Sequence, residues 1–496
     1  MGAGREARSA LPWPRVCQAA SGRVVRTNHW RECALGSVFG CGYLGVTHAA
    51  CMAELGHDVV GVDVDLREIT LLSNGQVAFY EPALQELVDR HVRSGNLRFT
   101  TFGADDARNA RIHFICVGTP QRGGSNAADT RYVDAVIGEL APQLTAGSLV
   151  VGKSTIRLAT ATRLAAQLRK LSPPGQDVAL AWSPEFLREG HSVHDTLNPD
   201  RLVLGVSDAW AERLLREIYA PLMSNGVPLV VTDLPTAELI KYGANAFLAT
   251  KISFINALAE LCEATGADVT VIAEVLAYDA RIGSQFLAPG LGFGGGCLSK
   301  DIRALHACAR ELGVGDAVSF LSDVDHINMR RRARTVDLIA QKVGWAMSGR
   351  RIAILGAPFK PDSDDVRDSP ALHVANDIQQ AGGDVVIYDP RAMANARRVY
   401  PALAYARTVW DACRGADVVA LLTEWPEFRD ISTDELGKVV SERHIVDARN
   451  ALSAADWLRV GWSYTALGRP PAAGADGVTG AQGASCASRR PVAGRR

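Results

Sequence analysis

Short apolar runs alternate with amphipathic stretches along most of this chain. Residues 34–63 read as strand, glycine turn, helix and strand. Further apolar runs follow at residues 112–117, 149–151 and 179–182, and in the segments RLVLG and PLVVT. Short runs separated by helical patterns predict parallel strands joined by crossover helices. Residues 34–234 are therefore expected to form one α/β domain.

One long helix is predicted from Pro235 to about Thr265. Its apolar residues recur at helical spacing, namely at Leu239, Phe247, Phe254, Ile255, Leu258 and Leu261. A helix of this length spans roughly 45 Å and usually bridges domains or forms the core of a dimer. Residues 235–345 are therefore expected to be a central helical and dimerisation region.

A second α/β unit is predicted over residues 346–468. Its expected strands are RIAILG, GGDVVIYDP, ADVVALLTEW and HIVDARNAL, with a helix in each crossover. A basic helix, DHINMRRRARTVDLIAQKV, precedes them. Its triple arginine is interpreted as a solvated face, because a charge run is more often solvated than part of a binding patch.

The turn after the first strand carries a nucleotide-binding pattern. Gly40, Gly42 and Gly45 form GxGxxG between strand and helix, and Asp63 closes the next strand about twenty residues later. Such glycines let a pyrophosphate approach the helix N-terminus, and the carboxylate binds the adenosine ribose, which favours NAD over NADP. The predicted fold class is α/β, with two Rossmann-like doubly wound domains joined by a long central helix and a helical dimerisation region.

Polar residues follow several of the expected strands. Thr119 and Thr155 each follow one. Because ligands of parallel sheets bind at the carboxyl ends of strands, both are expected to touch a cofactor. Glu185 and Glu189 in SPEFLREG are four residues apart and would face one cleft if that segment is helical. Solvated surface acids are the alternative.

The segment GLGFGGGCLSKDIRAL, residues 290–305, holds a candidate nucleophile. Its glycines lead into Cys297, where the chain turns helical. The N–H groups at a helix start lower a thiol pKa. Asp301 lies four residues on, on the same face, and Lys300 is beside it. This is a candidate site for covalent catalysis; a glycine turn with a buried, inert cysteine is the alternative.

Other basic residues suit anion recognition. Lys241 and Asn245 lie four residues apart near the start of the long helix, where they could donate to an oxyanion; a lysine extending to the surface is the alternative. Lys360, Arg367 and Arg449 fall at strand ends or in adjacent loops of the second unit. Those positions suit phosphates or a sugar nucleotide.

Composition narrows the class of protein. A chain of 496 residues with 47% hydrophobic residues is expected to hold two or three domains. A net charge of -1 does not favour a nucleic-acid partner. Ten scattered cysteines without a CxxC pair argue against a disulfide scaffold and against a metal site. Reduced thiols favour a cytoplasmic location, and no apolar run is long enough to span a membrane.

The two ends of the chain have a different composition. Residues 1–33 are rich in arginine and poor in acids. A transit peptide, a disordered extension and a start codon assigned too far upstream are all compatible with this composition. Residues 469–496 are rich in Gly, Ala and Ser and are expected to be a disordered tail.

From about residue 35 to 468, the chain resembles the UDP-glucose/GDP-mannose dehydrogenase family. The motifs that carry the resemblance, in the family's order, are GCGYLG, CVGTPQ, KST, SPEFLREG, NPDRLVLG, AELIKYGANAFLATKISFINALAELCE, GFGGGCLSKD, FKPDSDDVRDSPAL, YDP and LLTEWPEF. The resemblance implies three parts: an NAD domain, a central helical region used for dimerisation, and a C-terminal nucleotide-sugar domain. A homodimer or higher homo-oligomer is therefore expected.

The resemblance implies a four-electron oxidation of UDP-glucose to UDP-glucuronate in two NAD-dependent hydride steps. Cys297 would add to the aldehyde, and the resulting thioester would be hydrolysed by water. Lys241 and Asn245 would steady the oxygen anions. Asp301, with Thr155, would assist proton transfer or position water, and Glu185 would act in the thioester hydrolysis.

The resemblance also implies two sets of contacts. The cofactor contacts would be Gly40, Gly42, Tyr43, Leu44, Gly45, Asp63, Thr119, Thr155, Glu189, Lys300 and Arg367. The substrate contacts would be Glu185, Lys241, Asn245, Gly290, Leu291, Gly292, Phe293, Gly294, Lys360 and Arg449. Arg281 resembles an arginine that reaches the substrate across the dimer interface.

This chain departs from the family pattern at a few positions. Ser299 replaces a proline in the CxPKD segment, which is expected to loosen the turn after Cys297. Glu68 replaces a basic residue near the ribose aspartate, and Ala448 replaces a glycine. None of these changes removes a catalytic group.

Two alternatives belong to other functional classes. One is a sibling dehydrogenase acting on GDP-mannose or a UDP-N-acetyl-hexosamine. The other is a non-catalytic protein that binds sugar nucleotides, against which the intact set of Cys297, Lys241, Asn245 and Asp301 argues. The LLTEWPEF and SPEFLREG segments favour UDP-glucose.

Overall fold

The computed structural model describes residues 35–101, 110–121 and 128–470. The predictions for residues 1–33 and for the tail beyond residue 470 lie outside these ranges. Arg469, which was assigned to the tail, is described: its Nε donates to Asp268 Oδ2 at 3.2 Å. Within the described ranges, no helix combines the length and the apolar character needed to cross a bilayer.

The N-terminal unit is built on one sheet. Its described strands lie in the order β3 (Leu97–Thr101), β2 (Asp58–Asp63), β1 (Leu35–Phe39), β4 (Ile112–Ile115), β5 (Leu149–Gly152), β6 (Ala179–Trp182), β7 (Leu202–Gly205) and β8 (Leu229–Thr232). Neighbours are parallel except β6 and β7, which meet antiparallel at Trp182 and Gly205. β4, β5 and β6 are buried at every residue, as expected for parallel strands covered on both faces.

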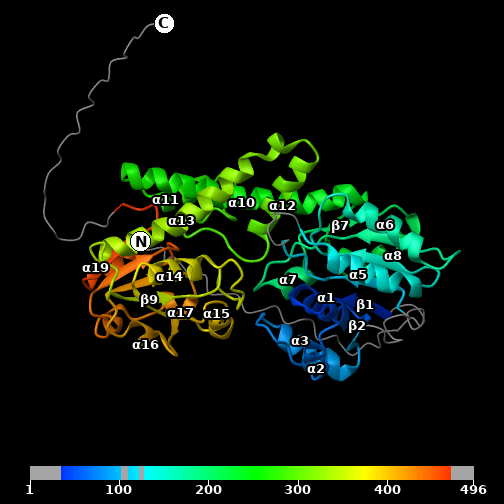
Figure 1. Ribbon diagram of the computed structural model, residues 1–496, viewed down its shortest axis with the longest axis horizontal. Coiled ribbons are helices and arrows are strands. Elements are labelled where there is room, and N and C mark those ends of the chain that lie inside the picture. Colours follow the sequence, from blue (N-terminus) through cyan, green and yellow to red (C-terminus); the bar gives the residue numbers. More distant parts are fainter. Residues whose placement is uncertain (1–34, 102–109, 122–127, 471–496) are drawn as a thin grey trace, which may run out of the picture.

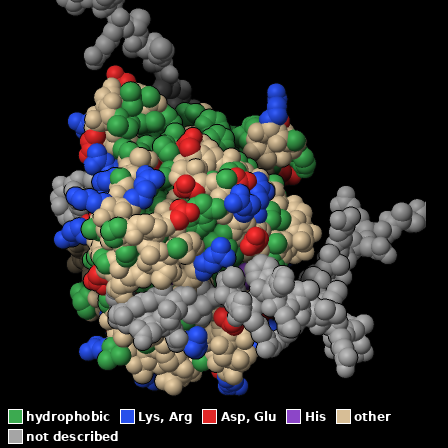
Figure 2. Space-filling view, turned by 90° about the vertical axis from the view of Figure 1, so that its right-hand side faces the viewer, with side chains coloured by type: hydrophobic (Ala, Val, Ile, Leu, Met, Phe, Trp, Pro, Cys, Tyr) green, Lys and Arg blue, Asp and Glu red, His purple; other side chains and the backbone are tan. Residues whose placement is uncertain are grey.

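Helices cover both faces of this sheet. They are α1 (Tyr43–Glu54), α2 (Leu66–Ser73), α3 (Leu84–Ser94), α5 (Arg131–Leu140), η2 (Ala141–Gln143), α6 (Thr160–Leu171), α7 (Ser192–Leu197), α8 (Ala209–Ile218) and α9 (Ala220–Ser224). One core joins α1, α3 and α8 to the sheet, and a second joins α5 and α6 to the other face. Basic and acidic side chains are interspersed over the end of the molecule seen in Figure 2.

The predicted long helix is α10 (Leu234–Thr265). Asp233 caps its N-terminus by accepting from the Thr236 N–H, and Gly266 ends it with a left-handed φ of 77°. Figure 1 shows α10 running above both units, from the N-terminal sheet on one side to the C-terminal sheet on the other. Its last turns meet the C-terminal unit, because Gly468 packs on Ala259. The prediction that this helix bridges the two domains is confirmed.

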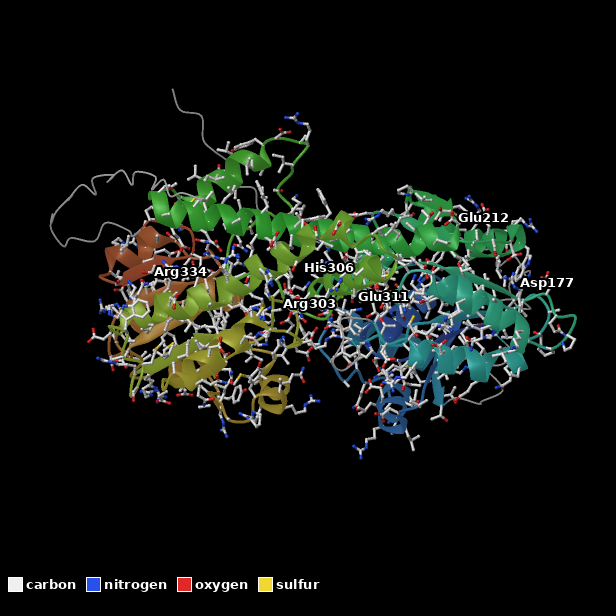
Figure 3. All side chains as sticks on the ribbon, turned by 45° about the horizontal axis from the view of Figure 1, so that its top comes forward. Asp177, Glu212, Arg303, His306, Glu311 and Arg334 are labelled. Carbon is white, nitrogen blue, oxygen red and sulfur yellow. The ribbon has the colours of Figure 1, made fainter. Side chains whose placement is uncertain are left out.

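Shorter helices follow α10: α11 (Val269–Ala277), α12 (Leu298–Glu311), η3 (Gly315–Val318) and α13 (Phe320–Lys342). Figure 3 shows Arg303, His306 and Glu311 of α12 in the middle of the molecule, between the two units, and Arg334 of α13 above the C-terminal unit. α12 therefore lies between the two units.

The C-terminal unit contains a parallel sheet. Its described strands lie in the order β11 (Ala404–Tyr405), β10 (Asp384–Tyr388), β9 (Arg351–Leu355), β12 (Val418–Leu421), β13 (His444–Asp447) and β14 (Ser463–Ala466). Its helices are α14 (Pro370–Gln380), α15 (Met393–Val399), α16 (Val409–Cys413), α17 (Pro426–Arg429), α18 (Thr433–Leu436) and α19 (Ala454–Arg459). Apolar cores lie on both faces. The predicted fold class is confirmed, and β3, β11 and β14 are strands that the sequence analysis did not predict.

The triple arginine on α13 is not a solvated face. Arg331 and Arg332 are buried. Arg331 Nη2 pairs with Glu263 on α10 at 2.7 Å, and Arg332 Nη1 pairs with Asp368 of the C-terminal unit at 2.8 Å. The interpretation from sequence was wrong because both partners come from distant segments. α13 lies between α10 and the C-terminal unit, which enclose Arg331 and Arg332, whereas the side chain of Arg330 is 54% exposed.

Candidate active site

The glycine turn between β1 and α1 packs closely on the protein at Gly40 and Gly45, whereas Gly42 faces open space. Gly40 has a φ of 91°, and a Cβ there would lie 2.8 Å from Val117. A Cβ on Gly45 would lie 1.7 Å from the Gly40 carbonyl oxygen. Only glycine fits at these two positions, and α1 begins directly after the turn with Gly42 as its N-cap. The free N–H groups of this first turn suit a pyrophosphate.

Asp63 lies at the end of β2, beside the glycine turn. Its Oδ2 accepts from the Cys41 N–H at 2.6 Å, and its Oδ1 accepts from the Asp65 N–H at 3.0 Å. The carboxylate is therefore held at the edge where a bound adenosine ribose lies in dinucleotide-binding folds. Together with the glycine turn, this donor and acceptor set fits NAD.

Tyr43 and Leu44 lie in the first turn of α1, and the side chain of each contacts other parts of the protein. The Tyr43 hydroxyl bonds to Glu81 and accepts from the Gly190 N–H at 3.1 Å. Burial and the Glu81 carboxylate raise the pKa of Tyr43. Leu44 packs against the core of the N-terminal unit. Both side chains are thus engaged by protein, and the backbone N–H groups are what this turn offers to a ligand.

The loops that follow the carboxyl ends of β4 and β5 are hydrogen-bonded to each other. Thr119 Oγ1 donates to the Thr155 carbonyl oxygen at 2.6 Å, and Ser154 Oγ donates to the Val117 carbonyl oxygen at 2.6 Å. Thr119 and Thr155 therefore meet at the same edge of the sheet as the glycine turn.

Cys297 is the N-cap of α12, as the sequence predicted. Its side chain keeps an opening to solvent, and the Asp301 N–H donates to its carbonyl oxygen at 2.9 Å. Burial by the surrounding protein raises the pKa of the thiol to about 11; Lys241 opposes this shift, whereas Asp301 and Glu185 add to it. The prediction of a lowered thiol pKa from the helix start alone was wrong, because desolvation and the nearby carboxylates outweigh Lys241.

Buried polar residues from α10 and α12 meet beside Cys297. The Asn245 side-chain amide donates to Asp301 Oδ2 at 2.6 Å, and Lys241 Nζ lies 3.4 Å from Glu185 Oε1. Lys300 Nζ lies 3.1 Å from Asp301 Oδ1. Lys241, Asn245 and Asp301 are all buried. Burial lowers the pKa of Lys241, but Glu185, Cys297 and Asp301 together raise it above its usual value, so the ammonium stays charged.

Glu185 and Glu189 do not share a helix face, because residues 183–188 are not helical. Glu185 Oε2 instead accepts from the Leu187 N–H at 2.8 Å, which satisfies the local backbone without a helical turn. Glu189 accepts from Arg367 Nη2 at 2.8 Å. Burial and Asp365 raise the pKa of Glu189 to about 8, while Arg367 opposes the shift.

Arg367 brings the C-terminal unit against the loop before Cys297. A Cβ on Gly296 would lie 2.7 Å from Arg367 Cζ. Burial lowers the pKa of Arg367, but the hydrogen bonds that its guanidinium donates to the Asp365 carboxylate help to raise the pKa above its usual value. Lys360 lies in the same interdomain region, where burial lowers its pKa and Glu189 opposes that shift.

The glycine loop from Gly290 to Gly294 is held by its neighbours. Leu291 packs in the core of the C-terminal unit, and Phe293 packs in the core between α10, α12 and α13. Asn328 holds the Phe293 backbone with two hydrogen bonds, at 2.8 and 2.9 Å. The loop is therefore enclosed by the two cores and by Asn328. The sequence analysis missed Asn328, although an asparagine inside a helix is a weak signal of a special role.

Arg449 connects this loop to the C-terminal unit. Its guanidinium donates to three carbonyl oxygens: Leu422 at 2.7 Å, Phe359 at 2.8 Å and Gly292 at 3.3 Å. Arg449 thereby holds the glycine loop against the carboxyl end of β12.

Arg281 is the predicted site residue that the structure does not bring to Cys297. It lies on an exposed turn after α11 and pairs with Asp279 at 2.6 Å. Its side chain is 89% exposed.

Ser299 does not loosen the turn after Cys297. Its hydroxyl donates to Asp368 Oδ2 at 2.7 Å, and its side chain is buried. The sequence-based expectation was wrong because the partner lies in the other unit.

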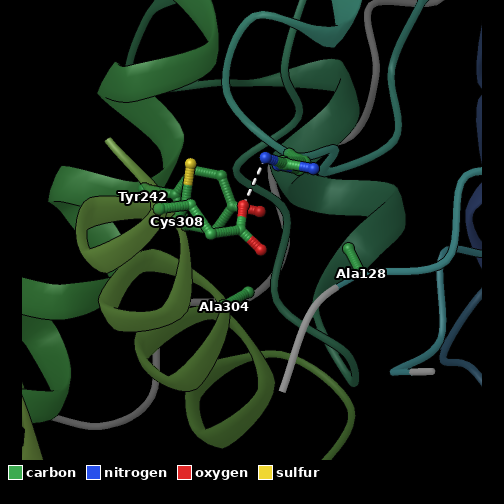
Figure 4. A pocket seen from close by; sticks show the side chains of 6 residues that line it. Ala128, Tyr242, Ala304 and Cys308 are labelled. Carbon is green, nitrogen blue, oxygen red and sulfur yellow. Dashed lines mark ion pairs between the residues drawn. The ribbon is translucent and has the colours of Figure 1, made fainter. Parts of the chain in front are cut away.

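A small pocket lies between α12, α10 and the N-terminal unit (Figure 4). It is lined by Ala128, Arg157, Tyr242, Ala304, Cys308 and Glu311. An ion pair between Arg157 and Glu311 joins its two sides. No residue predicted for the active site lines this pocket, so it is separate from the surroundings of Cys297.

A nucleotide-binding turn on one Rossmann-like unit and a cysteine at a helix start between the two units define a two-domain dinucleotide-dependent dehydrogenase. The chain belongs to the UDP-glucose/GDP-mannose dehydrogenase family. The family's NAD binding domain matches residues 35–223, its central domain matches residues 235–330, and its UDP binding domain matches residues 353–454. The resemblance found in the sequence is confirmed, and the chain is an NAD-dependent oxidoreductase.

Similar proteins cover nearly the whole described chain. It is 41% identical to UDP-glucose 6-dehydrogenase of Rhizobium meliloti (strain 1021), over 88% of this chain and 99% of the relative. It is 36% identical to UDP-glucose 6-dehydrogenase TuaD of Bacillus subtilis (strain 168), over 89% and 94%. The solved structure of a UDP-glucose dehydrogenase from Pyrobaculum islandicum matches with a TM-score of 0.81 and 34% identity, covering 90% of this chain and 100% of that one.

Proposed function

We propose that this chain oxidises UDP-glucose to UDP-glucuronate at Cys297, with NAD as the acceptor. The observation that carries the proposal is the buried set of Lys241, Asn245 and Asp301 around an accessible cysteine at the junction of an NAD-binding and a UDP-binding domain. Relatives that are named UDP-glucose 6-dehydrogenases and align over almost the full chain support the choice of sugar nucleotide.

The polar groups around Cys297 suit an alcohol that is oxidised twice. Bound NAD accepts one hydride in each oxidation. The Lys241 ammonium and the Asn245 amide donate to the sugar oxygen as negative charge develops on it. The Cys297 sulfur adds to the aldehyde carbon, so that the second oxidation leaves a thioester on the sulfur. Hydrolysis by water then releases the carboxylate and restores the thiol.

Carboxylates beside the sulfur are suited to proton transfer. Asp301 lies between Asn245 and Lys300, and Glu185 lies beside Lys241. We assign to Asp301, with Thr155, the positioning of water or the removal of a proton, and to Glu185 a role in hydrolysis of the thioester.

Ligand contacts divide into a cofactor set and a sugar-nucleotide set, and each set draws on more than one unit of the fold. On the cofactor side we assign Gly40, Gly42, Tyr43, Leu44, Gly45, Asp63, Thr119, Thr155, Glu189, Lys300 and Arg367. On the sugar-nucleotide side we assign the backbone of the Gly290 to Gly294 loop, with Glu185, Lys241, Asn245, Lys360 and Arg449. The hydrogen bonds that Arg449 makes to Gly292 and Phe359 support a role in holding this loop.

A second copy of the chain would cover α10 and α11. Large apolar side chains are at least half exposed along one stripe of α10, at Leu239, Phe247, Phe254 and Leu261, and on α11 at Val271 and Val275. An exposed apolar stripe on a long helix is typical of a helix-to-helix interface. Arg281 follows this surface, so an assembled dimer could bring it to the partner's site.

Replacing Phe247 and Phe254 by glutamate tests the dimer. Two charges within the stripe are expected to give a monomer by light scattering after size-exclusion chromatography. Replacing the exposed Val399 of the C-terminal unit by glutamate should leave the assembly unchanged.

The cytoplasmic location is proposed from the cysteines of the described residues, all of which are free.

The NADH formed per sugar nucleotide tests the reaction. Two NADH per UDP-glucose is the expected result, with little turnover of GDP-mannose or of a UDP-N-acetyl-hexosamine. Turnover of either of those instead would indicate a sibling dehydrogenase. Binding of UDP-glucose without NADH formation would indicate a non-catalytic protein.

A further inference from the structure

A side-chain hydrogen bond joins α12 to the C-terminal unit two residues after Cys297. Ser299 is the second helical residue of α12, whose N-cap is Cys297. Its side chain is buried, and its Oγ donates to Asp368 Oδ2 at 2.7 Å. Asp368 precedes the first residues of α14 in the C-terminal unit. The bond therefore crosses between the helix that carries the thiol and the UDP-binding side of the protein.

Asp368 is itself fixed by the surrounding elements. Its other carboxylate oxygen, Oδ1, accepts from Arg332 Nη1 on α13 at 2.8 Å. Arg332 Nη2 also donates to the Phe293 carbonyl oxygen at 3.2 Å. Asp368 has a φ of 43°, a left-handed conformation that a residue other than glycine adopts only when its surroundings hold it there. One carboxylate thus connects α12, α13 and, through Arg332, the glycine loop.

The backbone on either side of this carboxylate packs closely against the same loop. A Cβ on Gly294 would lie 2.4 Å from the Asp368 carbonyl oxygen. The Gly295 N–H donates to the Arg367 carbonyl oxygen at 3.0 Å. The loop before Cys297 and the first turn after it therefore rest on one short segment of the C-terminal unit.

Ser299 is placed to control where the sulfur lies relative to that unit. Without its hydroxyl, the first turn of α12 loses the described side-chain hydrogen bond between Ser299 and the C-terminal unit. Small displacements of a reacting group are costly, since a misplacement of about 1 Å can reduce a rate by about 10²-fold. We propose that Ser299 is a positioning residue, which holds Cys297 in register with the sugar nucleotide through Asp368. This inference rests on the proposed oxidation of UDP-glucose.

The variants Ser299→Ala and Ser299→Thr separate the hydroxyl from the packing. Ser299→Ala is expected to lower kcat about tenfold while KM for UDP-glucose and NAD stays within about twofold, because Ser299 is not among the residues assigned to either ligand. Ser299→Thr keeps the hydroxyl and should restore most of kcat. The matched control is Ser207→Ala, which removes a hydroxyl that bonds to the Asp208 carboxylate at 2.9 Å on the exposed surface of the N-terminal unit. It should leave all constants unchanged.

The alkylation rate of Cys297 gives a readout that needs no substrate. Burial raises the pKa of this thiol. A first turn that is freed from Asp368 should admit more water, so iodoacetamide should modify Cys297 about threefold faster in Ser299→Ala at pH 8 while kcat falls. Faster alkylation together with a lower kcat is the expected pattern, and an unchanged thermal unfolding midpoint of Ser299→Ala distinguishes repositioning from general damage. The alkylation measurement remains valid even if the wild-type protein forms no NADH with UDP-glucose. That result would overturn the proposed function but not the role of Ser299 in positioning Cys297.

Asp368→Asn is a second variant that tests the same hydrogen bond. It can be used even if Ser299→Ala does not fold. Asp368→Asn should lower kcat by a similar factor. The double variant should be no slower than Asp368→Asn alone, because Asp368→Asn already weakens the bond that Ser299→Ala removes. Wild-type kcat and alkylation in Ser299→Ala, equal losses in Ser299→Ala and Ser299→Thr, or additive losses in the double variant would each overturn the inference.

Discussion

The Asn245 side-chain amide donates a hydrogen bond to the Asp301 carboxylate at 2.6 Å, between two buried residues on different helices. Asn245 lies on α10, which bridges the two units, and Asp301 lies in the first turn of α12, which carries Cys297. This contact sets the position of a carboxylate beside the sulfur relative to the cofactor-binding unit.

Replacing Asn245 by aspartate should abolish most of the activity. The change removes a donor and places a second carboxyl group against Asp301, so one of the two must hold a proton. We expect kcat to fall on the order of 10²-fold or more, as for the loss of an oxyanion donor. The control is Asn225→Asp on the exposed loop after α9. Activity of Asn245→Asp near that of wild type would contradict the assigned role.

Cys297→Ser should stop the reaction at or near the aldehyde stage. A serine hydroxyl at this position is a much poorer nucleophile than a thiolate. Binding of UDP-glucose and NAD, measured by calorimetry, should survive the change. Cys308→Ala, which removes a buried thiol from the same helix, is the control and should keep two NADH per UDP-glucose. The same yield from Cys297→Ser would exclude covalent catalysis by this cysteine.

Alkylation of Cys297 in the ligand-free protein should depend steeply on pH. Burial raises the pKa of Cys297 to about 11, so the thiol form predominates at neutral pH. The reactive thiolate should therefore increase about tenfold per pH unit between about pH 7 and pH 10. Mass spectrometry of the Cys297 peptide after timed iodoacetamide treatment measures this rate. A rate that levels off between about pH 9 and pH 10, as expected for free cysteine with a pKa near 8.5, would contradict the raised pKa.

Asp63 should make the protein prefer NAD to NADP. Its carboxylate is held at the end of β2 by the Cys41 and Asp65 N–H groups, where it would repel a 2′-phosphate. We expect kcat/KM to favour NAD on the order of 10²-fold, and Asp63→Asn to reduce that ratio. Asp65→Asn alters a neighbouring carboxylate that caps α2 and should leave the ratio unchanged. Equal use of both cofactors by the wild type would refute this placement.

Glu263→Gln should destabilise the fold without touching the site. Burial alone would raise the pKa of Glu263, but hydrogen bonds from Arg331 and Arg334 lower it below its usual 4.5. This stabilisation is therefore present above about pH 4.5 and lost as the pH falls through the folded-state pKa. Leaving the fully buried Arg331 without this partner should cost about 3 kcal/mol.

Thermal unfolding at pH 7 compares this change with a surface pair. Glu212, which is labelled in Figure 3, pairs with Arg216 on the surface of α8. Glu212→Gln removes this pair and should lower the free energy of unfolding by about 0.3–0.5 kcal/mol. Similar losses of stability in the two variants would show that the buried pair contributes no more than the exposed one.

The order of elements and the family could be predicted from the amino-acid sequence alone. Apolar periodicity distinguishes the strands from α10, because these patterns reflect local backbone geometry. The glycine turn, Asp63 and Cys297 were found at their local positions for the same reason: each depends on the conformation of a few neighbouring residues. The short edge strands were missed, since an edge strand such as β3 alternates buried and exposed residues without a continuous apolar run.

Contacts between distant segments were decided by the tertiary structure. Arg331 and Arg332 are buried because α10 and the C-terminal unit supply their carboxylate partners, and Ser299 is held because Asp368 lies opposite it. The pKa of Cys297 is raised rather than lowered, because desolvation by the surrounding protein and the nearby carboxylates outweigh the effect of Lys241. Burial and charge pairing are properties of the packed chain, so the motif that places a thiol at a helix start does not determine its protonation or its partners.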